Sequence, residues 1–148
     1  MAPDVDQLLQ MSQSQLDALY SSSPPGPVPD GEAQGTAIIA PGTRFSSELA
    51  EFVSVFGWKG KAFDAKKSVL TNRITFLGLN AIIARIYEGP SLFDGKQCIV
   101  LDYSETSLIA GWLRDEIRQI GQGFYLGKVY GHEKPLMYFS LKFNGLDA

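Results

Sequence analysis

The residues best suited to chemistry lie in one stretch, from Ile99 to Tyr130, where ionisable side chains alternate with apolar ones. Charged groups in apolar surroundings are costly unless they are paired, so their density here needs a physical reason. The polar members of the stretch are Asp102, Tyr103, Ser104, Ser107, Arg114, Asp115, Glu116, Arg118, Tyr125 and Tyr130. We expect any functional site to draw on this group.

Asp102 and Tyr103 end an apolar run and, in an alternating strand, point to opposite faces. If Asp102 points inward it needs an arginine partner, because an unpaired buried carboxylate takes up a proton. A buried Asp–Arg pair is therefore one interpretation. The other is general acid or base chemistry in a cavity, with Asp102, Tyr103 and Glu116 as the catalytic residues. Tyr103, Tyr125 or Arg118 would then position the substrate or stabilise developing charge.

Arg114 and Arg118 would be like-charged neighbours on a helix, and their repulsion favours partners from elsewhere. The guanidinium fork suits a carboxylate or a phosphate, so anion capture stands beside a structural ion network. The aromatic residues toward the C-terminal end of the sequence favour either ordinary core packing or a barrel interior that accepts an amphipathic molecule. Gly127 within a strand indicates a need for space or a bend, and cavity space is one such need. The residues expected to contact a ligand are Trp58, Arg114, Arg118, Tyr125 and Tyr130.

Residue types that are scarce exclude several kinds of chemistry. With one histidine, His132 in a probable turn, and one cysteine, the sequence excludes a structural zinc site, and no acidic loop has calcium-binding spacing. It contains neither a phosphate-binding glycine loop nor a Gly-x-Ser-x-Gly elbow. We expect no metal and no cofactor. A formal net charge of −3 also disfavours nucleic acid as a partner.

The single cysteine, Cys98, lies in a probable strand and is expected to be buried and free, as suits a reducing compartment. The first residues lack the basic start and apolar run of a signal peptide. No segment approaches the roughly 20 apolar residues of a membrane span. These features predict a cytoplasmic location and no membrane span.

The first third of the chain predicts helices and a strap. A capping box at Asp4 begins an amphipathic helix that runs to Tyr20, and the proline-rich residues 21–30 favour an extended strap. Thr36 to Ala40 could add a strand or pack across an open end of the core. A second short helix is expected from Ser46 or Ser47 to Phe56. We accordingly divide the chain into residues 1–45, the helix and strap, and residues 46–148, a β domain.

From Trp58 onward the hydrophobic period changes from 3.6 to 2, which is typical of an antiparallel sheet. The segment from Ser104 to Ile120 fits either a strand or, as we favour before Ile117, a short helix or irregular crossing. The expected fold class is mainly β (α+β), an antiparallel meander forming a small barrel or half-barrel with two short N-terminal helices. The expected strands are Lys61 to Phe63, Val69 to Leu77, Ala81 to Glu88, Gln97 to Tyr103, Gly123 to Tyr130 and Leu136 to Phe143.

Several of these segments resemble a known family in their order. The matching segments are Trp58-Lys-Gly-Lys-Ala-Phe63, Ala84 to Tyr87, Asp115 to Arg118, Leu126-Gly127 and Tyr138-Phe-Ser-Leu141. They resemble the Gly-x-Trp-x-Gly proteins of bacteria and plants, over about two thirds of the chain, although Phe56 stands in place of the first glycine. The resemblance implies a calycin-like or lipocalin-like barrel that holds a small apolar ligand. It implies no catalytic residue.

Three functions follow from these features. The first is binding of a small hydrophobic or amphipathic molecule in a barrel cavity. The second is a cofactor-free isomerase, cyclase or lyase that uses an Asp/Glu-Tyr-Arg cluster in the same cavity. The third is a protein-interaction subunit, in which the segment from Val5 to Tyr20 and the strap dock on a partner, or a homodimer completes a sheet of six or seven strands.

Overall fold

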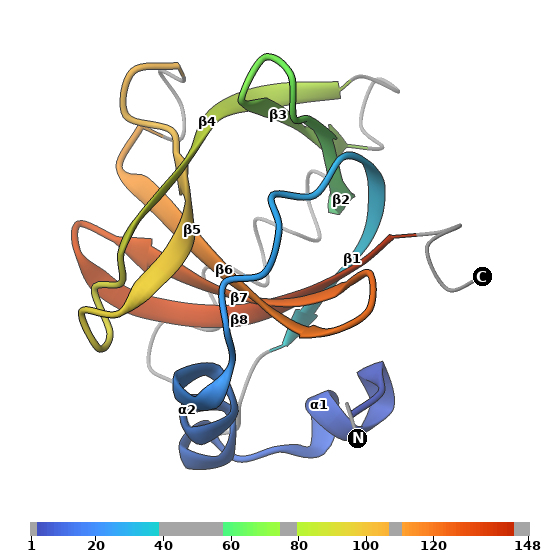
Figure 1. The fold of residues 1–148 in the computed structure, drawn as a ribbon, viewed down its shortest axis with the longest axis vertical. Coiled ribbons are helices and arrows are strands. Elements are labelled where there is room, and N and C mark those ends of the chain that lie inside the picture. The colour runs from blue at the N-terminus through green and yellow to red at the C-terminus, as the bar shows by residue number, and fades with distance from the viewer. Residues whose placement is uncertain (1–2, 39–57, 75–79, 107–110, 144–148) are drawn as a thin grey trace.

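The fold is a closed antiparallel barrel with two short helices before it. The computed structural model describes residues 3–38, 58–74, 80–106 and 111–143, which contain two helices and eight strands. Each strand pairs with the next along the chain, and the last pairs with the first, which closes the barrel (Figure 1). The elements are α1 (Val5–Gln10), α2 (Gln13–Ser22), β1 (Gly31–Ile38), β2 (Trp58–Asp64), β3 (Val69–Ile74), β4 (Asn80–Pro90), β5 (Gln97–Asp102), β6 (Leu113–Gly121), β7 (Phe124–Gly131) and β8 (Lys134–Phe143). The predicted fold class is thus confirmed.

The predicted helix up to Tyr20 is in fact two helices, each begun by a capping box. Asp4 caps α1 with Gln7, and Ser12 caps α2 with Gln15. Ser12 has extended backbone angles, because a residue that caps one helix does not continue the preceding one. The predicted helix from Ser46 or Ser47 to Phe56 lies outside the described residues.

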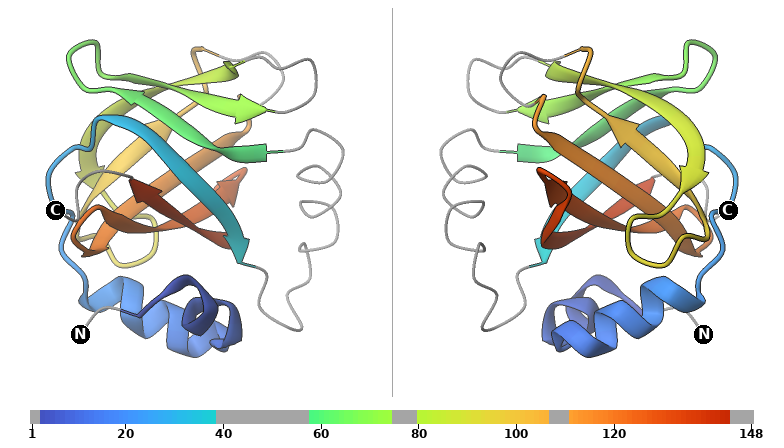
Figure 2. Two further views of the ribbon diagram at one scale, coloured as in Figure 1. Left: turned by 90° about the vertical axis from the view of Figure 1, so that its right-hand side faces the viewer. Right: turned by 90° about the vertical axis from the view of Figure 1, so that its left-hand side faces the viewer.

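The proline-rich segment after α2 lies over one end of the barrel, which we call the strap end (Figures 1 and 2). The Gln119 amide donates to the Pro24 carbonyl at 2.9 Å, and the Tyr125 hydroxyl donates to the Pro27 carbonyl at 2.6 Å. Prolines offer carbonyl acceptors but no amide donors, so this segment can accept bonds from the barrel without starting a new strand. It leads directly into β1.

The segment around Thr36, for which a strand was one alternative, belongs to β1. This strand pairs with β2 on one side and with β8 on the other. The expected boundary between residues 45 and 46 therefore falls after the first barrel strand. The eighth strand also removes the unpaired edge on which the homodimer hypothesis depended.

The strand alternative is right from Leu113 onward, where the favoured helix or irregular crossing is wrong, whereas the described residues before it, 104–106 and 111–112, form turns. β6 pairs antiparallel with β5 and β7, and Ile117 lies opposite Ile99 in the barrel core. Asp115 and Glu116, on opposite faces of β6, are both buried. The charged outer face of Arg114, Glu116 and Arg118 is regular, but the inner face includes the charged Asp115, so polar and apolar residues do not alternate cleanly along the strand.

Glycines in the wall of the barrel make room for aromatic rings. A Cβ atom at Gly127 would lie 2.1 Å from the ring of Phe139, its cross-strand partner. A Cβ atom at Gly35 would lie 2.3 Å from the ring of Trp58. The Trp58 and Phe139 rings meet edge to face, with centroids 5.9 Å apart. The space expected at Gly127 is therefore occupied by the Phe139 ring.

We expect Gly127→Ala to lower the free energy of unfolding by about 1–3 kcal/mol, because the added methyl group meets a ring within the closed wall. Urea unfolding followed by circular dichroism measures the change. Adding Phe139→Leu should recover part of the loss, since the smaller side chain vacates that space. Because Phe139→Leu also removes core packing, the comparison is with the sum of the two single losses, and simple additivity would contradict the proposed contact.

Candidate functional site

Four polar side chains meet inside the barrel: Lys61, Asn72, Tyr103 and Asp115, which we call the inner cluster. The Lys61 ammonium lies 3.0 Å from Asp115 Oδ2 and donates to Asn72 Oδ1 and Tyr103 Oη, each at 2.7 Å. Tyr103 Oη donates to Asp115 Oδ2 at 3.1 Å and accepts from Asn72 Nδ2 at 3.0 Å. All four residues are at least 95% buried. The three ammonium protons thus have three acceptors.

The inner cluster is built by strand alternation. Lys61 shares a face of β2 with Phe63, and Asp115 shares a face of β6 with Ile117. Tyr103 follows β5 directly and takes the same side as Leu101. Residues far apart in sequence are therefore brought to one position in the core by register alone.

Electrostatics favour a charged Lys61 and a neutral Tyr103. Burial alone would lower the pKa of Lys61, but the Asp115 carboxylate and the Tyr103 hydroxyl outweigh it, and the pKa is raised. Burial, reinforced by Asp115, raises the pKa of Tyr103 to about 12. Lys61 is consequently a hydrogen-bond donor rather than an amine nucleophile, and Tyr103 can act as a donor or acid rather than as a base.

Aromatic rings surround the ammonium group. Lys61 Nζ lies 5.6 Å from the ring centroid of Trp58, 5.4 Å from that of Tyr103 and 5.2 Å from that of Phe139. These distances are within the range of cation–π attraction. Trp58 Nε1 also donates to Asn72 Oδ1 at 3.0 Å, which joins one of these rings to the inner cluster.

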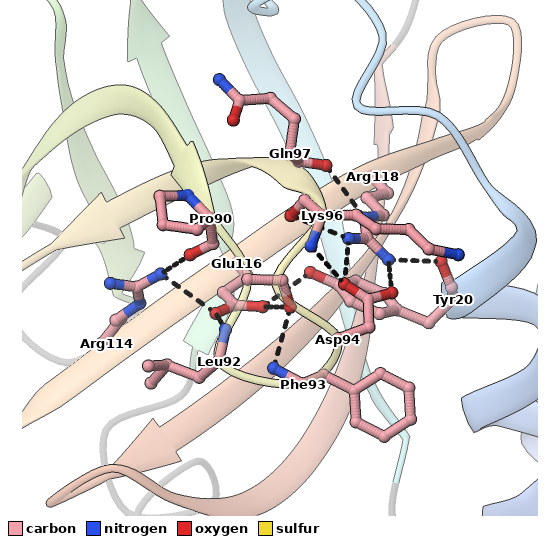
Figure 3. A network of polar contacts seen from close by, with 11 residues as sticks. Tyr20, Pro90, Leu92, Phe93, Asp94, Lys96, Gln97, Arg114, Glu116 and Arg118 are labelled. Atoms are coloured by element: carbon pink, nitrogen blue, oxygen red, sulfur yellow. Dashed lines mark hydrogen bonds and ion pairs between the residues drawn. The ribbon is translucent and has the colours of Figure 1, made fainter.

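A second polar group, the outer network, lies on the outside of the barrel beneath α2 and the loop after β4 (Figure 3). At its centre is Glu116, which is completely buried. Its carboxylate accepts four hydrogen bonds, between 2.6 and 3.1 Å long. The donors are the Tyr20 and Ser91 hydroxyls, the Leu92 amide and the Arg114 guanidinium. Glu116 therefore fastens a helix and a loop to the barrel wall.

Arg118 makes the second junction of the outer network. Its guanidinium donates to both carboxylate oxygens of Asp94, at 2.7 and 2.8 Å, and to the Tyr20 carbonyl at 2.9 Å. The Tyr20 ring lies 4.5 Å from the guanidinium carbon. The hydrogen bonds from Arg118 hold the pKa of Asp94 at about 2. The planar, two-bond pairing with Asp94 joins the loop to β6, and the bond to the Tyr20 carbonyl joins α2 to them.

The residues predicted as catalytic are divided between the two faces of the barrel wall. Tyr103 points inward, into the inner cluster. Glu116 is outside, in the outer network. Asp102 is also outside, where it accepts from the Tyr87 hydroxyl at 3.1 Å and from the Ser104 amide at 2.9 Å. Burial would raise the pKa of Asp102, but the hydrogen bonds from Ser104 and Tyr87 lower it.

The residues predicted to bind a ligand are divided in the same way. Trp58 borders the inner cluster, and Tyr125 lies inside the barrel at the strap end. Arg114 and Arg118 belong to the outer network. Tyr130 pairs with Arg114 across β6 and β7, and its buried hydroxyl has no hydrogen-bond partner among the described residues. Burial raises the pKa of Tyr130.

Lys61, Asn72 and Asp115 were missed as site residues. The sequence does contain a signal that Lys61 points inward. Lys61 lies two residues before Phe63 in a strand, and therefore on the same face, so an inward phenylalanine implies an inward lysine. Asp115 was among the polar residues considered, but its face depended on the assignment of β6. Nothing in the sequence places Asn72 beside them, because that contact depends on the register of β2 and β3.

Comparison with known proteins relates this chain to others by fold. No family model matches the sequence, and no curated protein matches it. A crystal structure of a protein from Thermomonospora curvata is similar, with a TM-score of 0.62 and 18% sequence identity, over 89% of this chain and 87% of that chain. The likeness supports a small antiparallel barrel and concerns the fold alone. Within the described residues, no helix is long and apolar enough to cross a membrane.

We expect Lys61→Met to lower the free energy of unfolding by about 3–5 kcal/mol, because it leaves the Asp115 carboxylate buried without its cation. The double variant Lys61→Met/Asp115→Leu should be less destabilised than the two single changes together. A double-mutant cycle of urea unfolding curves measures this coupling. Simple additivity of the two losses would show that the pair does not act as a unit.

The Asp94–Arg118 pair should make stability sensitive to acid. The folded pKa of Asp94, about 2, lies below the ordinary value near 3.9, so the pair stabilises above about pH 4 and its contribution disappears as the pH falls toward 2. In the Asp94→Asn variant, the free energy of unfolding should depend less steeply on pH over that range. Urea unfolding at a series of pH values measures this dependence. Asp6→Asn, on the exposed side of α1, is the control and should keep the wild-type slope.

Proposed function

We propose that the barrel binds one small hydrophobic or amphipathic molecule in its interior, with the polar end of that molecule at the inner cluster. The observation that supports this best is a buried ammonium group between three aromatic rings, inside a barrel whose other inward residues are mainly apolar. An eight-stranded barrel has the width at which side chains fill the interior or leave room for one small ligand. A few convergent polar groups in an apolar enclosure are typical of such sites.

The wall glycines favour this proposal. Gly35 and Gly127 let the Trp58 and Phe139 rings lie close to the backbone. Their faces, together with Met137, would contact the apolar body of the ligand, and methionine adapts readily to varied shapes. The calycin-like resemblance and a cytoplasmic location belong to the same proposal.

A second candidate function is cofactor-free acid catalysis at the inner cluster. The observation that favours it is the Tyr103 hydroxyl, held between the Lys61 ammonium and the Asp115 carboxylate. With its pKa raised to about 12, Tyr103 would donate a proton to a substrate oxygen, and the Asp115 carboxylate would take a proton from the same substrate and return it to the Tyr103 phenolate, so that no net proton is gained or lost. Asp115 would replace the predicted Asp102 and Glu116 in this chemistry, since both of those lie outside the barrel.

Binding can be measured through Trp58. Trp112→Phe leaves Trp58 as the only tryptophan, and octanol added to the delipidated protein should change its fluorescence saturably. Trp58→Phe keeps only the exposed Trp112 and should show no such change. Native mass spectrometry of protein from its own host should also detect a bound molecule. Absence of both a saturable change and a bound molecule would reject the proposed function.

A further inference from the structure

The inner cluster is balanced in charge, and this determines what kind of ligand it can accept. Lys61 and Asp115 form one ion pair whose side chains are only 4% and 6% exposed. Asn72 and Tyr103 add hydrogen bonds but no charge. A ligand that brings a further charge would bury that charge without a counterion, which is costly in an apolar interior.

One contact of the cluster can be exchanged for a ligand oxygen. Lys61 uses its third proton on Asn72 Oδ1, which also accepts from Trp58 Nε1. If a ligand oxygen replaces Asn72 as that acceptor, Asn72 Oδ1 keeps its Trp58 donor, and Asn72 Nδ2 keeps its Tyr103 acceptor. The ion pair with Asp115 is undisturbed. The exchange preserves both the hydrogen bonds and the charge balance.

We propose that the inner cluster selects ligands with a neutral oxygen head, an alcohol or a carbonyl group, and discriminates against the corresponding carboxylates. The proposal depends on the proposed function, because it names the ligand class for the same interior. It also identifies Asp115 as the residue that determines specificity. With Asp115 neutralised, the Lys61 ammonium would require an anion, and the preference would shift toward the carboxylate.

The test compares octanol with octanoate, two probes with the same chain and different heads, by Trp58 fluorescence in the Trp112→Phe background. We expect the wild-type cluster to bind octanol at least about tenfold more tightly at neutral pH. Asp115→Asn should tighten octanoate binding at least about tenfold and change octanol binding far less. Glu32→Gln, the same kind of change on the exposed outer face of β1, should alter neither affinity.

A pH series tests the proposal on the unchanged cluster, in case Asp115→Asn does not fold. If octanoate enters only with a proton, its affinity should fall about tenfold per pH unit between about pH 6 and about pH 8, whereas octanol affinity stays constant. Octanoate binding that equals octanol binding and does not vary with pH would overturn the inference while leaving the proposed function intact. Failure of both probes to bind would count against the proposed function itself.

Discussion

The structure depends on the burial of both faces of β6 and β7. The inner face of this wall belongs to the barrel core, and its outer face is covered by α2 and the loop after β4. Every charged side chain on either face must therefore find a partner within the protein. Lys61 with Asp115 inside and Arg118 with Asp94 outside are results of that constraint, as are the pairs Arg114 with Glu116 and Lys128 with Asp17.

The two polar groups lie back to back across β6, and they differ in what they hold. Asp115 faces inward and Glu116 outward, so successive residues serve the inner cluster and the outer network. The outer network joins α2, a loop and the barrel wall, which suits a structural fastening. The inner cluster links β2 and β3 to β6 and the end of β5 across the interior of a barrel that backbone pairing already closes. This contrast is why we assign the functional proposal to the inner cluster.

The sequence predicted the sheet, the strap and most of the strands, because alternating apolar residues and turn signals are local features. It failed at β6, where Arg114, Glu116 and Arg118 have outer-face partners contributed by distant segments. The candidate site was harder to predict than the fold. Tyr103 was recognised from its place at a strand end, but its partners Lys61 and Asn72 depend on pairings between strands. The high density of polar residues along the chain indicated the correct region. It did not separate the inner cluster from the outer network, which lie on opposite sides of the barrel wall.

The closure of the barrel by β1 and β8 has a consequence for synthesis on the ribosome. β1 pairs with the last strand as well as with β2, and Tyr20 of α2 bonds to Glu116 of β6, so the first 38 residues emerge long before some of their partners. The contacts that can form at once are local ones within α1 and α2, such as the two capping boxes, whose hydrogen bonds span three residues each. The pairings between the chain's early and late segments carry a large loop-closure entropy. The N-terminal arm therefore cannot complete its contacts until the barrel's last strand has been made.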